Sequence, residues 1–203
     1  MKIVKDALIM TAITVVFGLL LGLVYEITKE PIAQANYNAQ QEAYRNVFTE
    51  AESFVEYEGF DEAAAEAVVA DSGYPDNTIE GVVVAQDGSG AALGYVVTVT
   101  SHAGYGGDIT FSVGITNEGV VNGYSITAIS ETAGLGMKAN ESDFYSQFEE
   151  KAVESLEVVK GTATADNQIE AISGATITSR AVTNGVNVSL AYFRTIEGGS
   201  ANE

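Results

Sequence analysis

The sequence feature that most limits the possible folds of this chain is a run of nineteen uncharged residues near the N-terminus. The run extends from Ala7 to Tyr25 and is bracketed by Asp6 and Glu26. At a rise of 1.5 Å per residue, a helix of this length spans about the 30 Å hydrocarbon core of a bilayer. The run therefore predicts a single transmembrane helix.

The charges on either side of this run predict its orientation in the cell membrane. Lys2 and Lys5 precede it, and no further basic residue occurs before Lys29. Because short cytoplasmic flanks are enriched in Lys and Arg, we expect the N-terminus in the cytoplasm and the rest of the chain outside it. The expected organisation is a cytoplasmic N-terminus and transmembrane anchor at 1–25, a linker helix at 26–50 and an extracytoplasmic domain at 51–203.

Two other interpretations of the apolar run remain. Ala33-Gln34-Ala35 has the A-x-A form of a signal-peptidase site, although the run is longer than the 7–15 residues usual in a signal peptide. The stretch between the run and this site is also charged, which favours a retained anchor. A buried helix of a soluble protein fits less well, because no charged residue interrupts any face of the run.

The composition of the chain limits which ligands and cofactors it can bind. A length of 203 residues suits one domain with an appendage. The net charge of −19 would repel phosphate backbones, which argues against nucleic-acid binding. The chain has no Cys and a single His, His102, so it lacks the ligands of iron–sulfur clusters, attached haem and thiolate or His-rich metal sites. No metal site is expected, and redox chemistry would require an organic cofactor.

Beyond the anchor, hydrophobic periodicity predicts an α+β domain. Pro31 suits a first helical turn, and helical spacing of apolar residues continues to Phe48. Four later segments alternate β-branched and polar residues between short turns, which predicts an antiparallel meander. These strands are expected at 79–85, 93–100, 109–115 and 122–129, and further helices at 61–70, from Ser142, and from about Ser179.

Three candidate sites have simpler explanations. Ser101 and His102 are adjacent, and neighbours on a strand point to opposite faces, so a serine hydrolase is not expected. Residues 134–139 match the dinucleotide-binding pattern G-x-G-x-x-A, but that fingerprint requires a parallel βαβ unit. The acidic stretch 50–80 lacks the pattern of a calcium loop and is interpreted as solvated surface.

The segment from Ser173 to Ser179, SGATITS, is a stronger candidate. It combines four hydroxyl groups and a glycine with the expected start of the last helix. Free amides and the positive end of the helix dipole would suit an anion. An ordinary Ser/Thr cap has the same composition, and spacing alone does not choose between the two.

Residues 170–176, EAISGAT, resemble the D-x-x-[ST]-G-A-T acceptor of extracytoplasmic FMN-binding domains. In that family a flavin transferase joins the phosphate of FMN to the last Thr as a phosphoester, and the matching residue is Thr176. Residues 131–136, ETAGLG, are similar to the family's E-T-P-G-L-G segment near the isoalloxazine ring. Residues 104–107, GYGG, and 28–33, TKEPIA, add a resemblance to the G subunit of the Rnf electron-transport complex.

This resemblance implies a flavoprotein subunit that relays electrons within an ion-translocating ferredoxin:NAD oxidoreductase and has no independent catalytic activity or catalytic residues. The implied partners are the other Rnf subunits and, during maturation, the flavin transferase. Because no ionisable residue lies between Ala7 and Tyr25, the ion path is expected in the partners. The implied cofactor is FMN, attached covalently to Thr176, with the phosphate received by the amides of Thr178, Ser179 and Arg180. The other implied cofactor-binding residues are Ser173, Gly174, Ala175, Ile177, Thr178, Ser179, Glu131, Thr132, Gly134, Leu135, Gly136 and Lys138.

The chain departs from the family pattern at two positions. Glu170 stands where the family has Asp, and Ala133 where it has Pro, and neither change removes the acceptor hydroxyl. The C subunit of the sodium-pumping NADH:quinone reductase shares the acceptor loop but is usually longer. A stand-alone anchored flavoprotein and a non-redox binding module, in which Thr176 caps a helix, remain alternatives.

Overall fold

The computed structural model describes the backbone of residues 2–200 and the side chains of residues 3–196. The side chain of Lys2, one of the two charges used to predict the orientation, lies outside the described residues, as do the last three residues of the domain expected at 51–203. The chain divides into two compact units, residues 1–39 and 40–203. The division falls inside the linker helix expected at 26–50.

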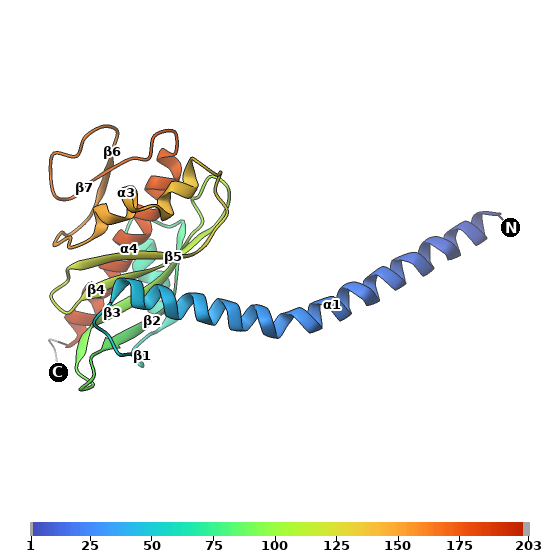
Figure 1. The fold of residues 1–203 in the computed structure, drawn as a ribbon, viewed down its shortest axis with the longest axis horizontal. Helices are drawn as coiled ribbons and strands as arrows, with labels where there is room; N and C mark the ends of the chain where they lie inside the picture. The colour runs from blue at the N-terminus through green and yellow to red at the C-terminus, as the bar shows by residue number, and fades with distance from the viewer. Residues whose placement is uncertain (1, 201–203) are drawn as a thin grey trace. The chain divides into compact units, whose positions relative to one another are not determined.

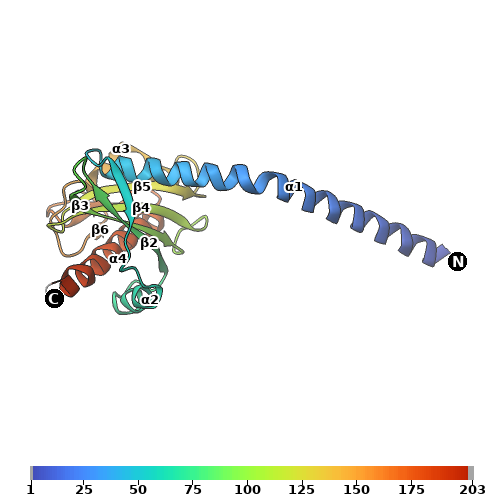
Figure 2. The same ribbon diagram turned by 90° about the horizontal axis from the view of Figure 1, so that it is seen from below.

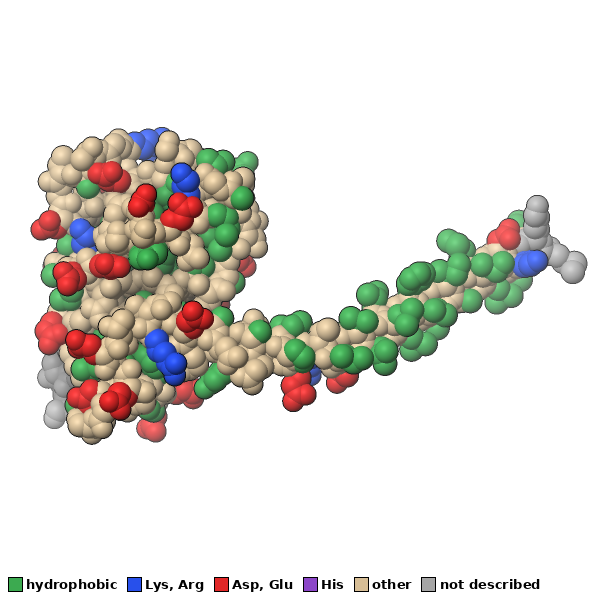
Figure 3. All heavy atoms as spheres, viewed as in Figure 1, with side chains coloured by type: hydrophobic (Ala, Val, Ile, Leu, Met, Phe, Trp, Pro, Cys, Tyr) green, Lys and Arg blue, Asp and Glu red, His purple; other side chains and the backbone are tan. Residues whose placement is uncertain are grey.

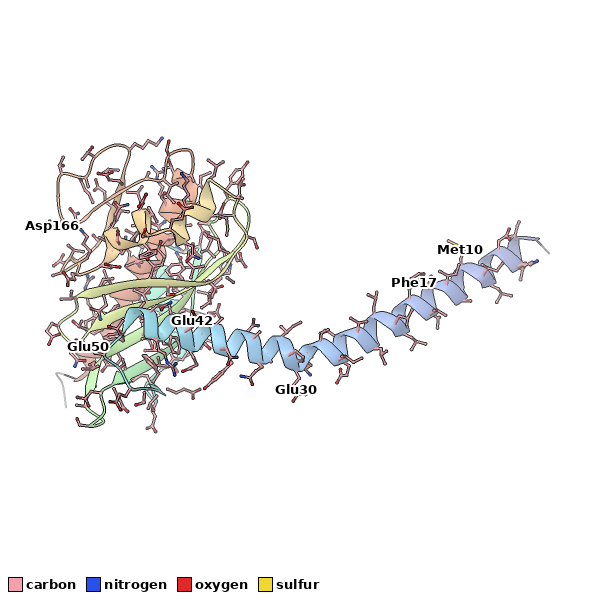
Figure 4. The ribbon with its side chains drawn as sticks, in the orientation of Figure 1. Met10, Phe17, Glu30, Glu42, Glu50 and Asp166 are labelled. Atoms are coloured by element: carbon pink, nitrogen blue, oxygen red, sulfur yellow. The ribbon has the colours of Figure 1, made fainter. Side chains whose placement is uncertain are left out.

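Helix α1 is continuous from Lys2 to Val47. Among the described residues it is the one helix that is long and apolar enough to cross a bilayer. Its side chains from Ile3 to Ile27 are exposed, and Figure 3 shows hydrophobic groups along this part of the helix. Figure 4 shows two of them, Met10 and Phe17, projecting from α1. Such exposure does not fit the buried core helix of a soluble protein, and it fits a single-pass membrane anchor.

The stretch expected as a helix from Pro31 to Phe48 is helical as far as Val47, but its expected start at Pro31 is wrong, because α1 passes through Pro31 without ending. Proline cannot donate to the carbonyl four residues earlier, but its fixed φ is helical. In Figure 4 the helix changes direction near Glu30, which precedes this proline. A local change of direction is the usual consequence of a proline inside a helix.

Residues 40–203 are built on an antiparallel sheet with the strand order β1-β2-β3-β4-β5 (Figure 1). The four expected meander strands are confirmed. The additional strand, β1, has four residues in the acidic stretch and pairs with β2 at the edge of the sheet. The bounds are β1 Ser53–Glu56, β2 Asn77–Gln86, β3 Ala92–Ser101, β4 Ile109–Thr116 and β5 Val121–Ile129.

The turn between β2 and β3 is organised by Asp87. Its Oδ1 accepts hydrogen bonds from the Ser89 hydroxyl at 2.7 Å, the Ser89 amide at 2.8 Å and the Ala91 amide at 3.0 Å. These hydrogen bonds, led by that from the Ser89 hydroxyl, hold the pKa of Asp87 below its usual value. The turn expected at Asp87-Gly88 therefore has a side-chain explanation.

Alternation along the strands divides the side chains of the sheet between two layers. Val97, Val99 and Phe111 belong to the main core, which includes α2 (Glu62–Asp71) and α4 (Thr176–Ser200). Val96 and Ala85 point to the other face and pack with residues of the last two turns of α1. Figure 2 shows the end of α1 on one side of the sheet and α2 and α4 on the other. The sheet is therefore covered on both faces.

Helix α4 approaches the sheet closely at Gly185. A Cβ at this position would lie 2.5 Å from Phe111 Cζ and 2.8 Å from Val99 Cγ1. The helix begins at Thr176, three residues before the expected start at Ser179. The earlier start places Thr176 in the first helical turn.

Short elements fill the connection from β5 to α4. The short helix expected from Ser142 is confirmed, with Phe144 and Phe148 buried. The Tyr124 hydroxyl of β5 donates to the Ala139 carbonyl at 2.5 Å, and burial raises the pKa of this tyrosine. The elements in this connection are η1 Gly136–Asn140, α3 Ser142–Tyr145, η2 Ser146–Phe148, β6 Glu157–Val159 and β7 Gln168–Glu170. In the described chain the pair β6 and β7 is the one parallel pairing, so residues 134–139 do not belong to a βαβ dinucleotide-binding unit.

Candidate functional site

A cavity of about 420 Å³ opens between the N-terminal end of α4 and the loop that follows β5. Its volume lies in the range of about 300–1,000 Å³ usual for small-molecule sites. The two sequence motifs, far apart in the chain, line it together. The lining residues are Tyr105, Glu131, Thr132, Leu135, Gly136, Gly174, Ala175, Thr176, Ile177 and Thr178.

A larger hollow, of about 970 Å³, lies between the end of α1 and the turns of the sheet. Its lining is mainly polar and includes Glu50, Glu118, Glu149 and Glu150. No group of acidic or His side chains in the described chain is arranged to hold a metal ion. Neither sequence motif reaches this hollow, so the smaller cavity is the candidate site.

The first turn of α4 presents free amides to the cavity. The Ala175 amide donates to the Ile172 carbonyl at 2.9 Å, and the Ser179 amide donates to the Ala175 carbonyl at 3.0 Å. Between them, the amides of residues 176–178 have no hydrogen-bond partner within residues 2–200, as is usual for the first turn of a helix. The amides expected to receive a phosphate were those of residues 178–180. In the structure the free amides are instead those of residues 176–178, because the helix begins earlier.

Gly174 and Ser179 shape the turn that precedes α4. Gly174 has a φ of +78°, in the left-handed region that favours glycine, and its Cβ position is 3.1 Å from Leu135 Cδ2. Ser179 is fully buried, and its hydroxyl accepts from the Ile172 amide at 2.9 Å and donates to the Ala175 carbonyl at 3.0 Å. Ser179, expected as a cofactor contact, therefore holds the loop together from inside.

Glu131, Gly136 and Thr178 form the buried part of the lining. Glu131 is 8% exposed and Thr178 is 1% exposed. A Cβ at Gly136 would lie 2.5 Å from Glu131 Oε2 and 2.7 Å from Thr178 Oγ1. Neither of these two oxygens forms a hydrogen bond with another described residue. Two polar atoms therefore converge on the space that only glycine leaves open.

The loop at residues 104–107 contributes Tyr105, which the expected site did not include. The Tyr105 amide donates to Glu131 Oε1 at 2.7 Å. A Cβ at Gly106 would lie 2.3 Å from the Ser130 carbonyl oxygen, so this loop lies directly against the start of the ETAGLG segment. The GYGG motif was visible in the sequence. Its contact with Glu131 could not be predicted, because Tyr105 lies in the connection from β3 to β4 and Glu131 in the connection that follows β5.

Three large apolar side chains are exposed around the cavity, and we call them the apolar rim. Tyr105 is 73%, Leu135 42% and Ile177 52% exposed. Among residues 40–196 one other large hydrophobic side chain, Val55, is exposed. Exposed apolar groups gathered at a cavity mark a binding surface.

The other expected site residues lie outside the cavity lining. Ser173, Gly134 and Lys138 are exposed and Ser179 is buried, and none of the four lines the cavity. Glu170, which replaces the family's Asp, lies in β7, and its Oε1 accepts from the Ala163 amide at 2.8 Å. The carboxylate therefore organises the loop before β7.

His102 belongs to a separate surface arrangement. Its Nε2 lies 3.0 Å from Thr78 Oγ1, and its Nδ1 lies 3.0 Å from Asp108 Oδ1. The imidazole is 45% exposed, whereas Ser101 is fully buried. The ring bridges the ends of the 102–108 loop, which fits an exposed histidine with a structural role.

Two family models match the chain. One, described as the FMN-binding domain, matches residues 104–191, which include every residue that lines the cavity. The other, described as the RnfG N-terminal region, matches residues 1–47, which cover α1.

Curated relatives match over most of their length. The chain is 34% identical over 196 residues to the G subunit of the Na⁺-translocating ferredoxin:NAD⁺ oxidoreductase complex of Acetobacterium woodii, and the alignment covers 95% of this chain and 92% of that protein. It is also 34% identical over 182 residues to the G subunit of the proton-translocating ferredoxin:NAD⁺ oxidoreductase complex of Clostridium ljungdahlii, covering 90% and 86%.

A solved structure supports the fold. The crystal structure of NqrC from Shewanella oneidensis is similar with a TM-score of 0.51 at 16% sequence identity, over 76% of this chain and 88% of that one. At this identity the likeness shows the fold alone. The identity to full-length relatives, together with both family models, decides the family. The chain belongs to the family of membrane-anchored, FMN-binding G subunits of Rnf complexes.

Proposed function

We propose that this protein relays electrons between neighbouring subunits of an ion-translocating ferredoxin:NAD oxidoreductase through an FMN bound in the cavity at the start of α4. The observation that most supports this proposal is the position of Thr176, which lines the cavity beside free amides, close-packed glycines and the apolar rim. Relatives named as G subunits of such complexes support the assignment of the complex.

The cavity fits the two chemically different ends of FMN. The free amides of residues 176–178 and the positive end of α4 suit the phosphate. The apolar rim suits a flat ring, and Gly136 and Gly174 allow the backbone to approach it. When bound, FMN supplies reversible uptake and release of electrons, and the protein supplies binding, orientation and electrostatics.

The attachment in this proposal is covalent and uses the hydroxyl of Thr176. This side chain is partly buried, lines the cavity and forms no hydrogen bond with another described residue. Thr176 would supply Oγ1 to the flavin phosphorus of an activated flavin dinucleotide bound by the flavin transferase. The new O–P bond would replace the bond to the bridging oxygen, a nucleoside monophosphate would leave with that oxygen, and the hydroxyl proton would pass to solvent. The net product is a phosphodiester equal to Thr176 plus FMN less one water.

The proposal places the domain outside the cytoplasm, where a reversibly bound cofactor would be lost by dilution. A covalent bond makes retention independent of affinity. The apolar stretch of α1 holds no ionisable residue between Ala7 and Tyr25, so ion translocation is assigned to the partner subunits.

Intact mass tests this function. The full chain, purified in detergent from a host that contains a flavin transferase, is expected to carry the mass of FMN less one water and to remain fluorescent after denaturation. Thr176→Ala should have the unmodified mass and no fluorescence, whereas Thr176→Ser, which keeps a hydroxyl, should be modified. Thr162→Ala removes an exposed hydroxyl outside the cavity and is the matched control.

Two results would overturn the proposal. One is wild-type protein of unmodified mass from its native host. The other is fluorescence of Thr176→Ala that survives denaturation, which would place the bond elsewhere. The same spectra show whether residues 1–35 remain on the mature protein.

A further inference from the structure

Glu131 is a buried carboxylate without a cationic partner. It is 8% exposed, and among the described residues no Lys, Arg or His side chain lies within 4 Å of its carboxylate oxygens. Burying a charge without a counter-charge is costly, so such a residue needs a reason. The reason lies in what its two oxygens face.

One oxygen of Glu131 holds the loop that carries Tyr105. Oε1 accepts the Tyr105 amide hydrogen at 2.7 Å and lies 3.0 Å from the Cβ position of Gly104. Because Tyr105 is part of the apolar rim, this hydrogen bond positions one wall of the cavity from beneath. Three of the four residues of this loop, 104–107, are glycines, which have no side chain to hold the loop in place.

The other oxygen faces the cavity. Oε2 lies 2.5 Å from the Cβ position of Gly136, beside Thr178 Oγ1 at 2.7 Å from the same point, and it has no hydrogen-bond donor among the described residues. The carboxylate therefore bonds the 104–107 loop to the loop after β5, and its second oxygen lies near the same point as Thr178 of the first turn of α4.

We propose that Glu131 is a positioning residue of the flavin site, which fixes the Tyr105 loop and, through its negative charge at the cavity wall, lowers the reduction potential of the bound FMN. This inference rests on the proposed function. Electrons added to the ring increase its negative charge, and a fixed anion nearby disfavours that increase. The two halves of the proposal, position and charge, are separable by substitution.

Glu131→Gln removes the charge and keeps an oxygen that accepts the Tyr105 amide, whereas Glu131→Ala removes both. Glu118→Gln removes one exposed carboxylate from the β4–β5 turn, outside the cavity, and is the matched control for net charge.

The charge is tested by redox titration of the flavin-loaded full chain in detergent at one pH. Glu131→Gln is expected to raise the midpoint potential of the flavin by about 30 mV, which corresponds to a tenfold increase in the equilibrium constant for its two-electron reduction. Glu118→Gln should leave it within experimental scatter. A Glu131→Gln potential equal to that of the wild type would overturn the role of the charge.

The positioning role is tested without flavin, by hydrogen exchange in the Thr176→Ala background. The Tyr105 amide should be protected in this background and with Glu131→Gln, and should exchange at least tenfold faster with Glu131→Ala. An unprotected Tyr105 amide in the parent would overturn the positioning role, even if Glu131→Ala does not fold. If the wild-type protein carries no flavin, the proposed function is refuted. The exchange measurement would still test the hydrogen bond between the Tyr105 amide and Glu131, because it is made without flavin.

Discussion

At the residue scale, the site depends on glycines that let three segments meet. Gly136 is buried where Glu131 and Thr178 converge, and Gly174 takes a left-handed conformation against Leu135. These positions exclude side chains for different reasons, one steric and one conformational. The result is a cavity in which Gly136 and Gly174 leave room between the side chains of the other lining residues.

Substitution of Gly136 by Ala is expected to lower the free energy of unfolding by about 1–3 kcal/mol, because the new methyl group overpacks a buried contact. The closest atoms include Glu131 Cβ at 2.7 Å, which cannot move as freely as a side-chain end. Urea unfolding of the full chain in detergent, followed by tyrosine fluorescence, measures the change. Gly81→Ala is the control, since no heavy atom lies within 4 Å of its Cβ position. Equal destabilisation of the two variants would contradict the steric explanation.

At the element scale, the distance between α4 and the sheet determines where the first turn of α4 lies. The helix contacts Val99 and Phe111 through Gly185, and Asn187 extends the docking by accepting from the Leu156 amide at 2.7 Å and donating to its carbonyl at 2.9 Å. Thr176 stands at the N-terminal end of the same helix. A shift of α4 on the sheet would therefore move the Thr176 hydroxyl relative to the Glu131 side of the cavity.

Substitution of Gly185 by Val is expected to cost about 3 kcal/mol of stability, at the upper end of the usual overpacking range, because the side chain meets Phe111 and Val99. Asn184→Val adds a valine to the neighbouring, partly buried position and should cost under about 1 kcal/mol. Thermal unfolding of both variants measures the difference. A Gly185→Val protein as stable as Asn184→Val would show that the helix and sheet are not in close contact.

At the scale of the whole molecule, the two compact units are suited to different environments, lipid for the N-terminal unit and water for residues 40–203. The exposed apolar side chains of the N-terminal unit are stable in lipid, whereas residues 40–203 bury their own core and expose acidic groups. The net charge of −19 disfavours close association of the domain with anionic lipid or nucleic acid. The polypeptide is thus suited to attachment at a membrane by one helix.

Orientation is testable because the chain has no Cys. A single Cys introduced by Thr162→Cys is expected to react with a membrane-impermeant maleimide added to intact cells. A Cys introduced by Lys5→Cys should react only after the cells are lysed, because the positive flank is expected in the cytoplasm. Labelling of the Lys5→Cys protein in intact cells would reverse the proposed orientation.

The sequence by itself determined the features that depend on local composition. The apolar helix follows from an uncharged run of sufficient length, the meander from alternation, and one side of the cavity from the motif that ends at Thr176. Local patterns were insufficient where distant residues compete. Ser179 resembles a helix cap in the sequence. In the folded chain its buried hydroxyl instead bonds to the backbone of Ile172 and Ala175, and α4 starts at Thr176. Similarly, α1 continues through Pro31, because one lost hydrogen bond does not end a long helix.

Only the tertiary structure decided which side chains surround the cavity. Tyr105 and Glu131 are 26 positions apart and meet through a backbone amide, a contact that leaves no periodic or compositional signal. Lys138 lies only two residues from Gly136 and yet does not line the cavity, because the chain turns away into η1. Sequence motifs identify which segments share a site, whereas packing of those segments against the sheet determines which of their atoms face it.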